Sequence, residues 1–157
     1  MRIAIYCGAN SGSLPIYREA AAAVARYLAG QGIGIVYGGG KVGLMGAVAD
    51  AALSAGGEVI GVIPQSLMDK ELAHVGATQL HVVKSMHERK QMMTDLCDGV
   101  IALPGGFGTL DELFESLTWL QLGFHGKPIG LLNVAGFFDG LLGFITGARE
   151  AGFLRAE

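Results

Sequence analysis

The chain has 157 residues, which is the size of one domain and enough to bury a substantial core. Apolar residues make up 51% of it and charged residues 16%, and the formal net charge of −3 argues against nucleic-acid binding, which needs a basic surface. No apolar run is long enough to span a bilayer, and the first residues, MRIAIYC, begin a strand pattern rather than a leader, so we expect a cytoplasmic protein with no membrane partner.

Strand and helix patterns alternate along the whole chain, without repeats or a linker. In chain order we predict a strand at 2–7, a helix starting at Pro15, a strand at 34–38, a helix at 43–55, a strand at 58–64, a polar connection at 65–78, a strand at 79–84, a helix at 85–98, a strand at 99–104, a helix at 109–122, a strand at 128–133 and a helix at 137–151. Continuous apolar strands that alternate with helices are typical of a parallel sheet covered on both faces. The sequence therefore predicts an α/β fold with a doubly wound, Rossmann-like sheet, in a single nucleotide-binding domain spanning residues 1–157.

Three glycine-rich loops, CGANSG, YGGGKVG and PGGFGT, each follow the carboxyl end of a predicted strand. Ligands of such sheets bind beyond these ends, and a glycine loop that opens a helix favours an anion. Three such loops on one edge predict a nucleotide or another small phosphate ligand.

One of these loops, Gly38 to Gly43, satisfies the dinucleotide pattern G-x-G-x-x-G. A dinucleotide site also needs an acid at the carboxyl end of the next strand. Glu58 has roughly the right spacing but begins its strand, which places it at the opposite edge. We therefore expect no NAD site. Because the cysteines show no metal-ligand spacing and the histidines are scattered, we also expect no metal site.

The predicted helix at 85–98 begins with a Ser85-x-x-Glu88 capping box and carries a charge on its apolar stripe. Arg89 shares this stripe with Met93, while Lys90 lies at its edge. A buried guanidinium is costly unless it is paired, so Arg89 either snorkels to solvent, pairs within the fold or meets a ligand. Its position in a first turn at the carboxyl edge favours a ligand or a catalytic partner.

The stretch LPGGFGTLDEL places two carboxylates in the first turn of a helix that we expect to begin at Thr109. Thr109-x-x-Glu112 is a second possible capping box, in which Glu112 only reaches back to its own backbone. Asp111 has the features of a solvated first-turn acid. Alternatively, Glu112 faces the sugar of a nucleotide whose phosphate lies on the glycine loop. It would there stabilise an oxocarbenium-like transition state at C1′, with Arg89 holding it ionised and aligned.

At these residues the chain resembles the Lonely Guy (LOG) family. The pair MHERKQMM and LPGGFGTLDEL carries the resemblance, which extends from IAIYCGANSG through VYGGGKVGLMGAVADAA to TWLQLGFHGKPIGLLN. The resemblance implies a phosphoribohydrolase that releases free cytokinin, or adenine from AMP, together with ribose 5-phosphate, from a nucleoside 5′-monophosphate. It also implies a Rossmann-like homodimer without metal or redox cofactor.

The resemblance further assigns roles to individual residues. Arg89 and Glu112 are implied to be the catalytic pair. The implied substrate-binding residues are Gly39, Gly40, Glu71, Lys90, Gly105, Gly106, Phe107, Gly108, Thr109 and Thr118. Members of the family generally continue beyond AGFLRAE, so we expect their C-terminal strand and helix to be missing from this chain.

Two other functions remain to be weighed. The family was long labelled lysine decarboxylase, but that chemistry needs pyridoxal phosphate on a lysine, and no lysine here has such a setting. Similar folds also serve as non-catalytic carriers of phosphorylated pterin cofactors or nucleotides. That alternative needs no Arg–Glu pair, so Arg89 and Glu112 favour the enzyme.

Overall fold

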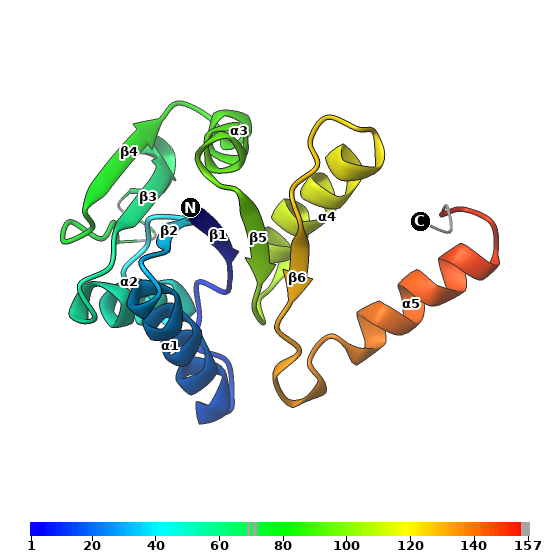
Figure 1. The fold of residues 1–157 in the computed structure, drawn as a ribbon, viewed down its shortest axis with the longest axis horizontal. Helices are drawn as coiled ribbons and strands as arrows, with labels where there is room; N and C mark the ends of the chain where they lie inside the picture. Colours follow the sequence, from blue (N-terminus) through cyan, green and yellow to red (C-terminus); the bar gives the residue numbers. More distant parts are fainter. Residues whose placement is uncertain (69, 71, 155–157) are drawn as a thin grey trace.

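The centre of the molecule is a six-stranded parallel sheet with the strand order β4-β3-β2-β1-β5-β6, seen in the computed structural model in Figure 1. Residues 1–68, 70 and 72–154 are described. The strands are β1 (Arg2–Tyr6), β2 (Gly34–Tyr37), β3 (Val59–Pro64), β4 (Gln79–Val83), β5 (Gly99–Ala102) and β6 (Ile129–Leu131). The order reverses beside β1, so the predicted doubly wound parallel sheet is confirmed.

The helices of the described residues are α1 (Pro15–Gly30), α2 (Gly43–Ser54), α3 (Met86–Leu96), α4 (Phe107–Gln121) and α5 (Asp139–Glu150), with 3₁₀ turns at Gln65–Leu67 and Val134–Gly136. The first four divide between the two faces of the sheet. Along β1, Ile5 packs with α1 and α2, whereas Ala4 and Tyr6 pack with residues of α3 and α4. Because successive strand residues face opposite sides of the sheet, each continuous apolar strand contributes side chains to two cores, one on each face.

Local signals set the starts of two helices as predicted. Pro15 is in the first turn of α1, where its missing N–H costs nothing. In α3 the hydroxyl of Ser85 accepts a hydrogen bond of 3.1 Å from the Glu88 backbone N–H. The Glu88 carboxylate reaches back one residue further than expected and accepts from the Lys84 N–H at 2.8 Å. This cap fixes the first turn that contains Arg89.

Glu58 lies at the amino edge of the sheet, as predicted. Its carboxylate forms a two-point ion pair with Arg2, with Nε–Oε2 and Nη2–Oε1 distances of 2.8 and 2.9 Å. It is therefore on the side of the sheet opposite to the loop at Gly38 to Gly43, and the dinucleotide pattern there lacks its acid.

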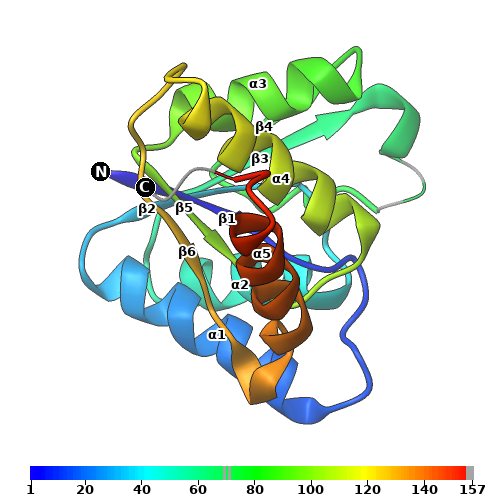
Figure 2. The ribbon, with the colours of Figure 1, turned by 90° about the vertical axis from the view of Figure 1, so that its right-hand side faces the viewer.

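The last helix, α5, projects away from the sheet (Figure 1), with Leu141 of its first turn packed against the core beneath α3 and α4, and Figure 2 views the molecule from the side on which it projects. None of its residues is buried, although its sequence is rich in leucine and phenylalanine. Phe144, for example, is 69% exposed. Among the helices of the described ranges, none is both long and apolar enough to cross a membrane.

Candidate functional site

A cavity of about 450 Å³ lies at the carboxyl edge of the sheet, where all three glycine loops contribute to its wall. The loop after β1 supplies residues 8–12, the loop after β2 supplies Gly38, and the loop after β5 supplies Pro104 to Gly106. The loops after β1 and β5 are joined by a hydrogen bond of 3.1 Å from the Gly8 N–H to the Pro104 carbonyl. The predicted convergence of the loops at one edge is thus confirmed.

Arg89 lines this cavity from the first turn of α3 and is only 4% exposed. Its Nε donates to the Val62 carbonyl at 3.0 Å and its Nη2 to the Gly38 carbonyl at 2.6 Å. Val62 lies within β3 and Gly38 directly follows β2, so the sheet itself orients the guanidinium. A side chain at Gly38 would bring its Cβ within 2.3 Å of Nη2, which explains the glycine there. Burial rules out the snorkelling alternative.

Glu112 lines the same cavity from α4, which begins earlier than predicted. The helix starts at Phe107 with Gly106 as its N-cap, and this N-cap makes no side-chain hydrogen bond. Thr109 is therefore already the third helical residue, and Glu112 falls in the second turn. The predicted start at Thr109 is wrong, and the alternative of a capping box there is excluded because Thr109 does not occupy the cap position.

The turn between β5 and α4 is closely packed on one side and open on the other. A Cβ at Gly105 would lie 2.0 Å from the Thr109 hydroxyl oxygen, whereas a Cβ at Gly106 or Gly108 would meet no atom within 4 Å. The first-turn N–H groups of a helix have no partner inside it. Gly106, Gly108 and Thr109 line the cavity at this end of α4, so an anion there meets those groups and the positive end of the helix dipole.

The negative charge of Glu112 contributes to the pKa of two side chains, one in β1 and one directly after it. Burial raises the pKa of Tyr6 to about 12, and the Glu112 carboxylate adds to the rise. Burial also raises the pKa of the Cys7 thiol, again with a contribution from Glu112. Both groups are therefore protonated at neutral pH, so Cys7 is not a thiolate nucleophile although it lines the cavity.

Lys90 does not line the cavity with Arg89. Its Nζ lies 2.8 Å from Glu115 Oε2 and 3.1 Å from Asp111 Oδ2, and its side chain is 9% exposed. Neighbouring helical residues point about 100° apart, so Lys90 faces α4 while Arg89 faces the carboxyl edge. Asp111, expected to be merely solvated, is thus an ion-pair partner.

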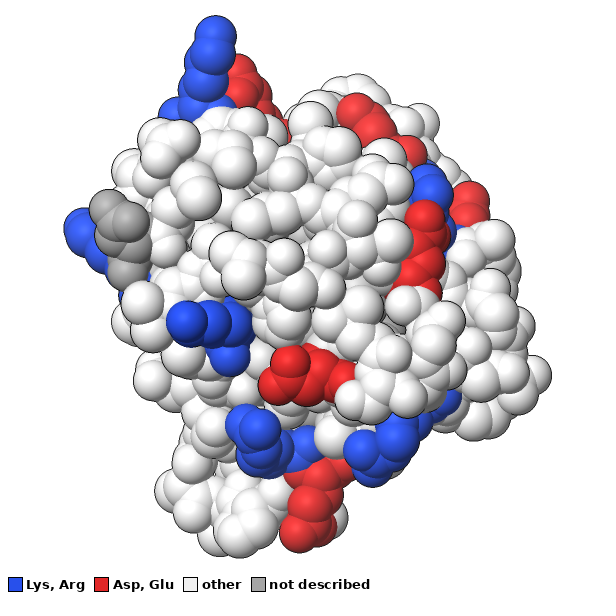
Figure 3. All heavy atoms as spheres, turned by 90° about the vertical axis from the view of Figure 1, so that its left-hand side faces the viewer, with Lys and Arg blue, Asp and Glu red and all other residues white. Residues whose placement is uncertain are grey.

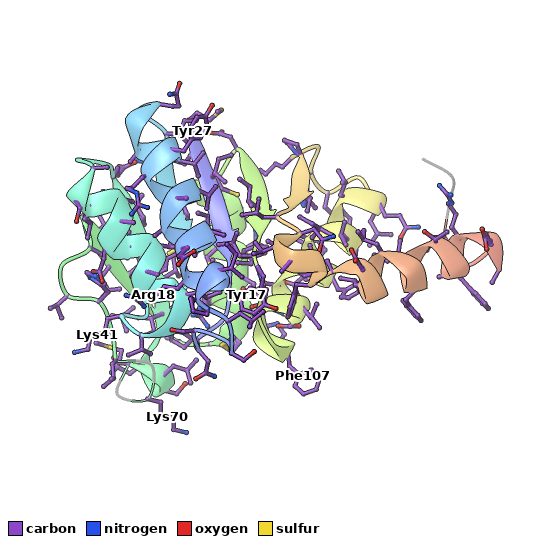
Figure 4. All side chains as sticks on the ribbon, turned by 90° about the horizontal axis from the view of Figure 1, so that it is seen from below. Tyr17, Arg18, Tyr27, Lys41, Lys70 and Phe107 are labelled. Carbon is purple, nitrogen blue, oxygen red and sulfur yellow. The ribbon has the colours of Figure 1, made fainter. Side chains whose placement is uncertain are left out.

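Several other residues that the resemblance implied as substrate contacts do not line the cavity either. Phe107 is 93% exposed and points away from the body (Figure 4), and Thr118 lies on the outer face of α4. Gly39 and Gly40 are buried residues of the loop after β2, and neither lines the cavity. Glu71 lies outside the described residues.

Part of the cavity wall is aromatic, which the sequence motifs do not predict. Tyr17 of α1 and Phe137 of the turn after β6 both line the cavity, with their rings edge to face and centroids 5.9 Å apart. Figure 4 shows Tyr17 near the middle of this edge. Phe137 follows the carboxyl end of a strand, which is the signal that would have found it, whereas the sequence around Tyr17 gives no such signal.

Two further features concern charge. Within residues 1–68, 70 and 72–154, no group of three or more His, Cys, Asp or Glu residues is arranged to hold a metal ion.

On the face shown in Figure 3, basic and acidic side chains are interspersed, without the continuous basic surface that nucleic-acid binding favours.

The chain is similar in sequence to several proteins that carry the same functional name. The family model described as "Possible lysine decarboxylase" matches residues 45–157. The cytokinin riboside 5′-monophosphate phosphoribohydrolase LOG of rice (Oryza sativa subsp. japonica) is 50% identical over 99% of this chain and 64% of its own length. The probable rice enzyme LOGL1 is 46% identical over 99% of this chain and 70% of its own length. Arabidopsis thaliana LOG1 is 46% identical over 98% of this chain and 72% of its own length.

Solved structures with a similar fold are more distant in sequence. The molybdenum cofactor carrier protein of Chlamydomonas reinhardtii is 22% identical with a TM-score of 0.75, over 97% of this chain and 86% of its own. The molybdenum cofactor binding protein of Rippkaea orientalis is 24% identical with a TM-score of 0.71, over 97% and 85%. At these identities the likeness concerns the fold alone.

The sequence relatives, in contrast, cover the glycine loops, Arg89 and Glu112 together. With identities of 46 to 50% over nearly all of its length, the chain belongs to the LOG family, the family of the cytokinin riboside 5′-monophosphate phosphoribohydrolases.

Proposed function

We propose that this protein is a phosphoribohydrolase that cleaves the N-glycosidic bond of a purine nucleoside 5′-monophosphate, releasing the free base and ribose 5-phosphate. The observation that carries the proposal is that Arg89 and Glu112, from two different helices, line one cavity with the glycine turn at the start of α4. Relatives at 46 to 50% identity that are named cytokinin riboside 5′-monophosphate phosphoribohydrolases support the same reaction. AMP as a substrate and a cytoplasmic location stay predictions.

The substrate phosphate would bind at the N-terminus of α4. Gly106, Gly108 and Thr109 line the cavity there, and backbone N–H groups at a helix start suit a phosphate without any lysine. The tight approach between Gly105 and Thr109 keeps the turn in the shape that presents these groups.

The ribose would then extend over Glu112 and Arg89. As the C1′–N bond breaks, positive charge develops on the sugar, and a carboxylate beside C1′ stabilises that charge. Water adds to C1′ and the base leaves with a proton. Arg89, held by the Val62 and Gly38 carbonyls, would keep Glu112 ionised and aligned without reorganising during the reaction.

The decarboxylase named in the family model does not fit the site. Lys41, Lys70, Lys84, Lys90 and Lys127 are all described residues, and none lines the cavity. A Schiff base with pyridoxal phosphate requires a lysine at the bound cofactor, so these residues do not suit that group.

The function is tested by incubating the protein with AMP, N6-isopentenyladenosine 5′-monophosphate and adenosine, and measuring the released base by chromatography. We expect base from both monophosphates and at least a hundredfold lower kcat/KM for adenosine, because it lacks the group that anchors the substrate at α4. A protein that binds nucleotides or a pterin tightly but releases no base would instead be a carrier.

We further infer that the protein is a homodimer. Large apolar side chains gather on α4, on α5 and on the segments that follow these helices, and each of the following is at least 36% exposed: Phe114, Leu120, Leu122, Phe124, Leu142, Phe144, Phe153 and Leu154. A monomer seldom leaves this many large apolar side chains exposed on neighbouring segments of its chain without a partner surface. A second copy of the chain is the partner that the resemblance to the family implies.

The substitution Phe144→Asp should convert the dimer into monomers, because it places a charge on the exposed apolar surface of α5 without touching the core. Sedimentation velocity should give about twice the chain mass of 16.3 kDa for the wild type and the single-chain mass for the variant. Tyr27→Asp, on the exposed side of α1, is the matched control and should leave the dimer intact. A monomeric wild type, or a dimeric Phe144→Asp variant, would contradict the assignment.

A further inference from the structure

A nearly buried lysine joins α3 to α4 directly beside the two cavity residues. Lys90 follows Arg89 on α3, and its ammonium group contacts Glu115 at 2.8 Å and Asp111 at 3.1 Å on α4. Asp111 in turn precedes Glu112. The ion pair therefore links the two helices one residue away from each member of the proposed catalytic pair.

The charges around Lys90 make it a poor phosphate ligand. Burial opposes its charge, but the hydrogen bonds and charges of Glu115 and Asp111 outweigh that effect and raise the pKa of Lys90. The lysine is therefore an ammonium ion at neutral pH, with two carboxylates close by. The three groups together carry a net charge of −1, which repels a phosphate rather than attracting one.

The same groups are well placed to control geometry. α3 and α4 pack on the same face of the sheet, and α4 is held to β1 by a 3.0 Å hydrogen bond between Ser116 Oγ and Tyr6 Oη. Lys90 adds a direct link between the two helices at the end nearer the cavity. Reactive groups must be held closely in place, since a displacement of about 1 Å can reduce a rate about a hundredfold.

We propose that Lys90 is a positioning residue, whose ion pairs with Asp111 and Glu115 set the placement of Arg89 against Glu112. This inference rests on the proposed function, and it replaces the nucleotide contact that the resemblance implied for Lys90. The two roles predict different kinetics. Loss of a positioning residue lowers kcat, whereas loss of a nucleotide contact raises KM.

The first variant is Lys90→Met, which keeps the apolar stem and removes the charge. Steady-state base release from AMP should show kcat reduced about 10- to 100-fold, with KM close to the wild-type value. Lys127→Met is the matched control, because Lys127 is a part-buried lysine that donates to the Thr94 carbonyl, away from the cavity. It should change thermal stability but not kcat.

The second variant, Asp111→Asn with Glu115→Gln, keeps Lys90 and removes its partners. A positioning role predicts the same fall in kcat, while a lysine released to bind phosphate would lower KM and leave kcat unchanged. This variant also tests the inference if Lys90→Met does not fold. In the reversed bridge, Lys90→Glu with Glu115→Lys, kcat should recover at least fivefold over Lys90→Glu alone.

The outcomes separate this inference from the function on which it rests. A wild-type protein that releases no base overturns both. An active wild type with a Lys90→Met variant of unchanged kcat, or of raised KM alone, overturns the positioning role and leaves the phosphoribohydrolase assignment in place. A fall in kcat that the reversed bridge does not recover also counts against the ion pair.

Discussion

Replacing Glu112 by glutamine should lower kcat for base release from AMP by about a thousandfold, while the chain still folds. Glutamine has nearly the same shape as glutamate but no negative charge, so it cannot stabilise the positive charge that develops at C1′. Glu112 lines the cavity and is not part of either apolar core, so packing should be unchanged. The measurement is chromatographic quantification of adenine, with thermal melting as the check on folding.

The variant also separates chemistry from binding. The phosphate end of the substrate would lie on the turn at Gly106 and Gly108, which this substitution does not touch, so KM for AMP should remain close to the wild-type value. Glu19→Gln, on the exposed side of α1, is the control for removing a carboxylate elsewhere and should be fully active. Undiminished turnover by the Glu112→Gln variant would refute the mechanism.

The sheet and the meeting of the glycine loops could be predicted from the sequence because both depend on short-range patterns. Strands buried on both faces are continuously apolar, and parallel strands place their carboxyl ends on one edge. These two rules were enough to bring the loops after β1, β2 and β5 together. The cap at Ser85 also depends on residues that are close in sequence, and its Ser85 half is confirmed, whereas the Glu88 carboxylate accepts from the N–H of Lys84 rather than of Ser85.

The predicted start of α4 at Thr109 is wrong because glycine is compatible both with a loop and with the start of a helix. Gly106 and Gly108 have low intrinsic helix propensity, which favoured a loop up to Thr109. Glycine is nevertheless acceptable at an N-cap, and in the first turn it leaves the backbone N–H groups open to a ligand. The consequence is functional, since the earlier start moves Glu112 into the second turn and removes its backbone-capping alternative.

The environment of Lys90 could not be predicted from the sequence at all. Helical periodicity placed it correctly at the edge of the buried stripe of α3, but its partners are 21 and 25 residues away on another helix. Which residues of α4 face α3 depends on how the two helices pack against the sheet, and no local pattern records that. The pairing of Tyr17 with Phe137 is a contact of the same kind, between α1 and the turn after β6.

Replacing Arg89 by methionine should have the second large effect, on stability as well as on activity. The substitution leaves the carbonyls of Val62 and Gly38 without their donors, at a cost of about 1 to 3 kcal/mol each. Part of this cost is offset because a buried charge is also removed. We expect a net loss of about 2 kcal/mol in the free energy of unfolding, measured with urea, and at least a thousandfold lower kcat/KM for AMP.

Arg89→Lys separates these two effects, because it keeps the positive charge and loses the planar fork. The ammonium group of the shorter lysine side chain cannot donate to both the Val62 and the Gly38 carbonyls and also keep the orientation that the guanidinium has toward the cavity. This variant should therefore be more stable than Arg89→Met yet still at least a hundredfold slower than the wild type. Arg26→Met, on the exposed side of α1, should leave both quantities unchanged. If Arg89→Lys kept wild-type turnover, positive charge alone would suffice at this position, and the fixed geometry supplied by the Val62 and Gly38 carbonyls would have no part in the reaction.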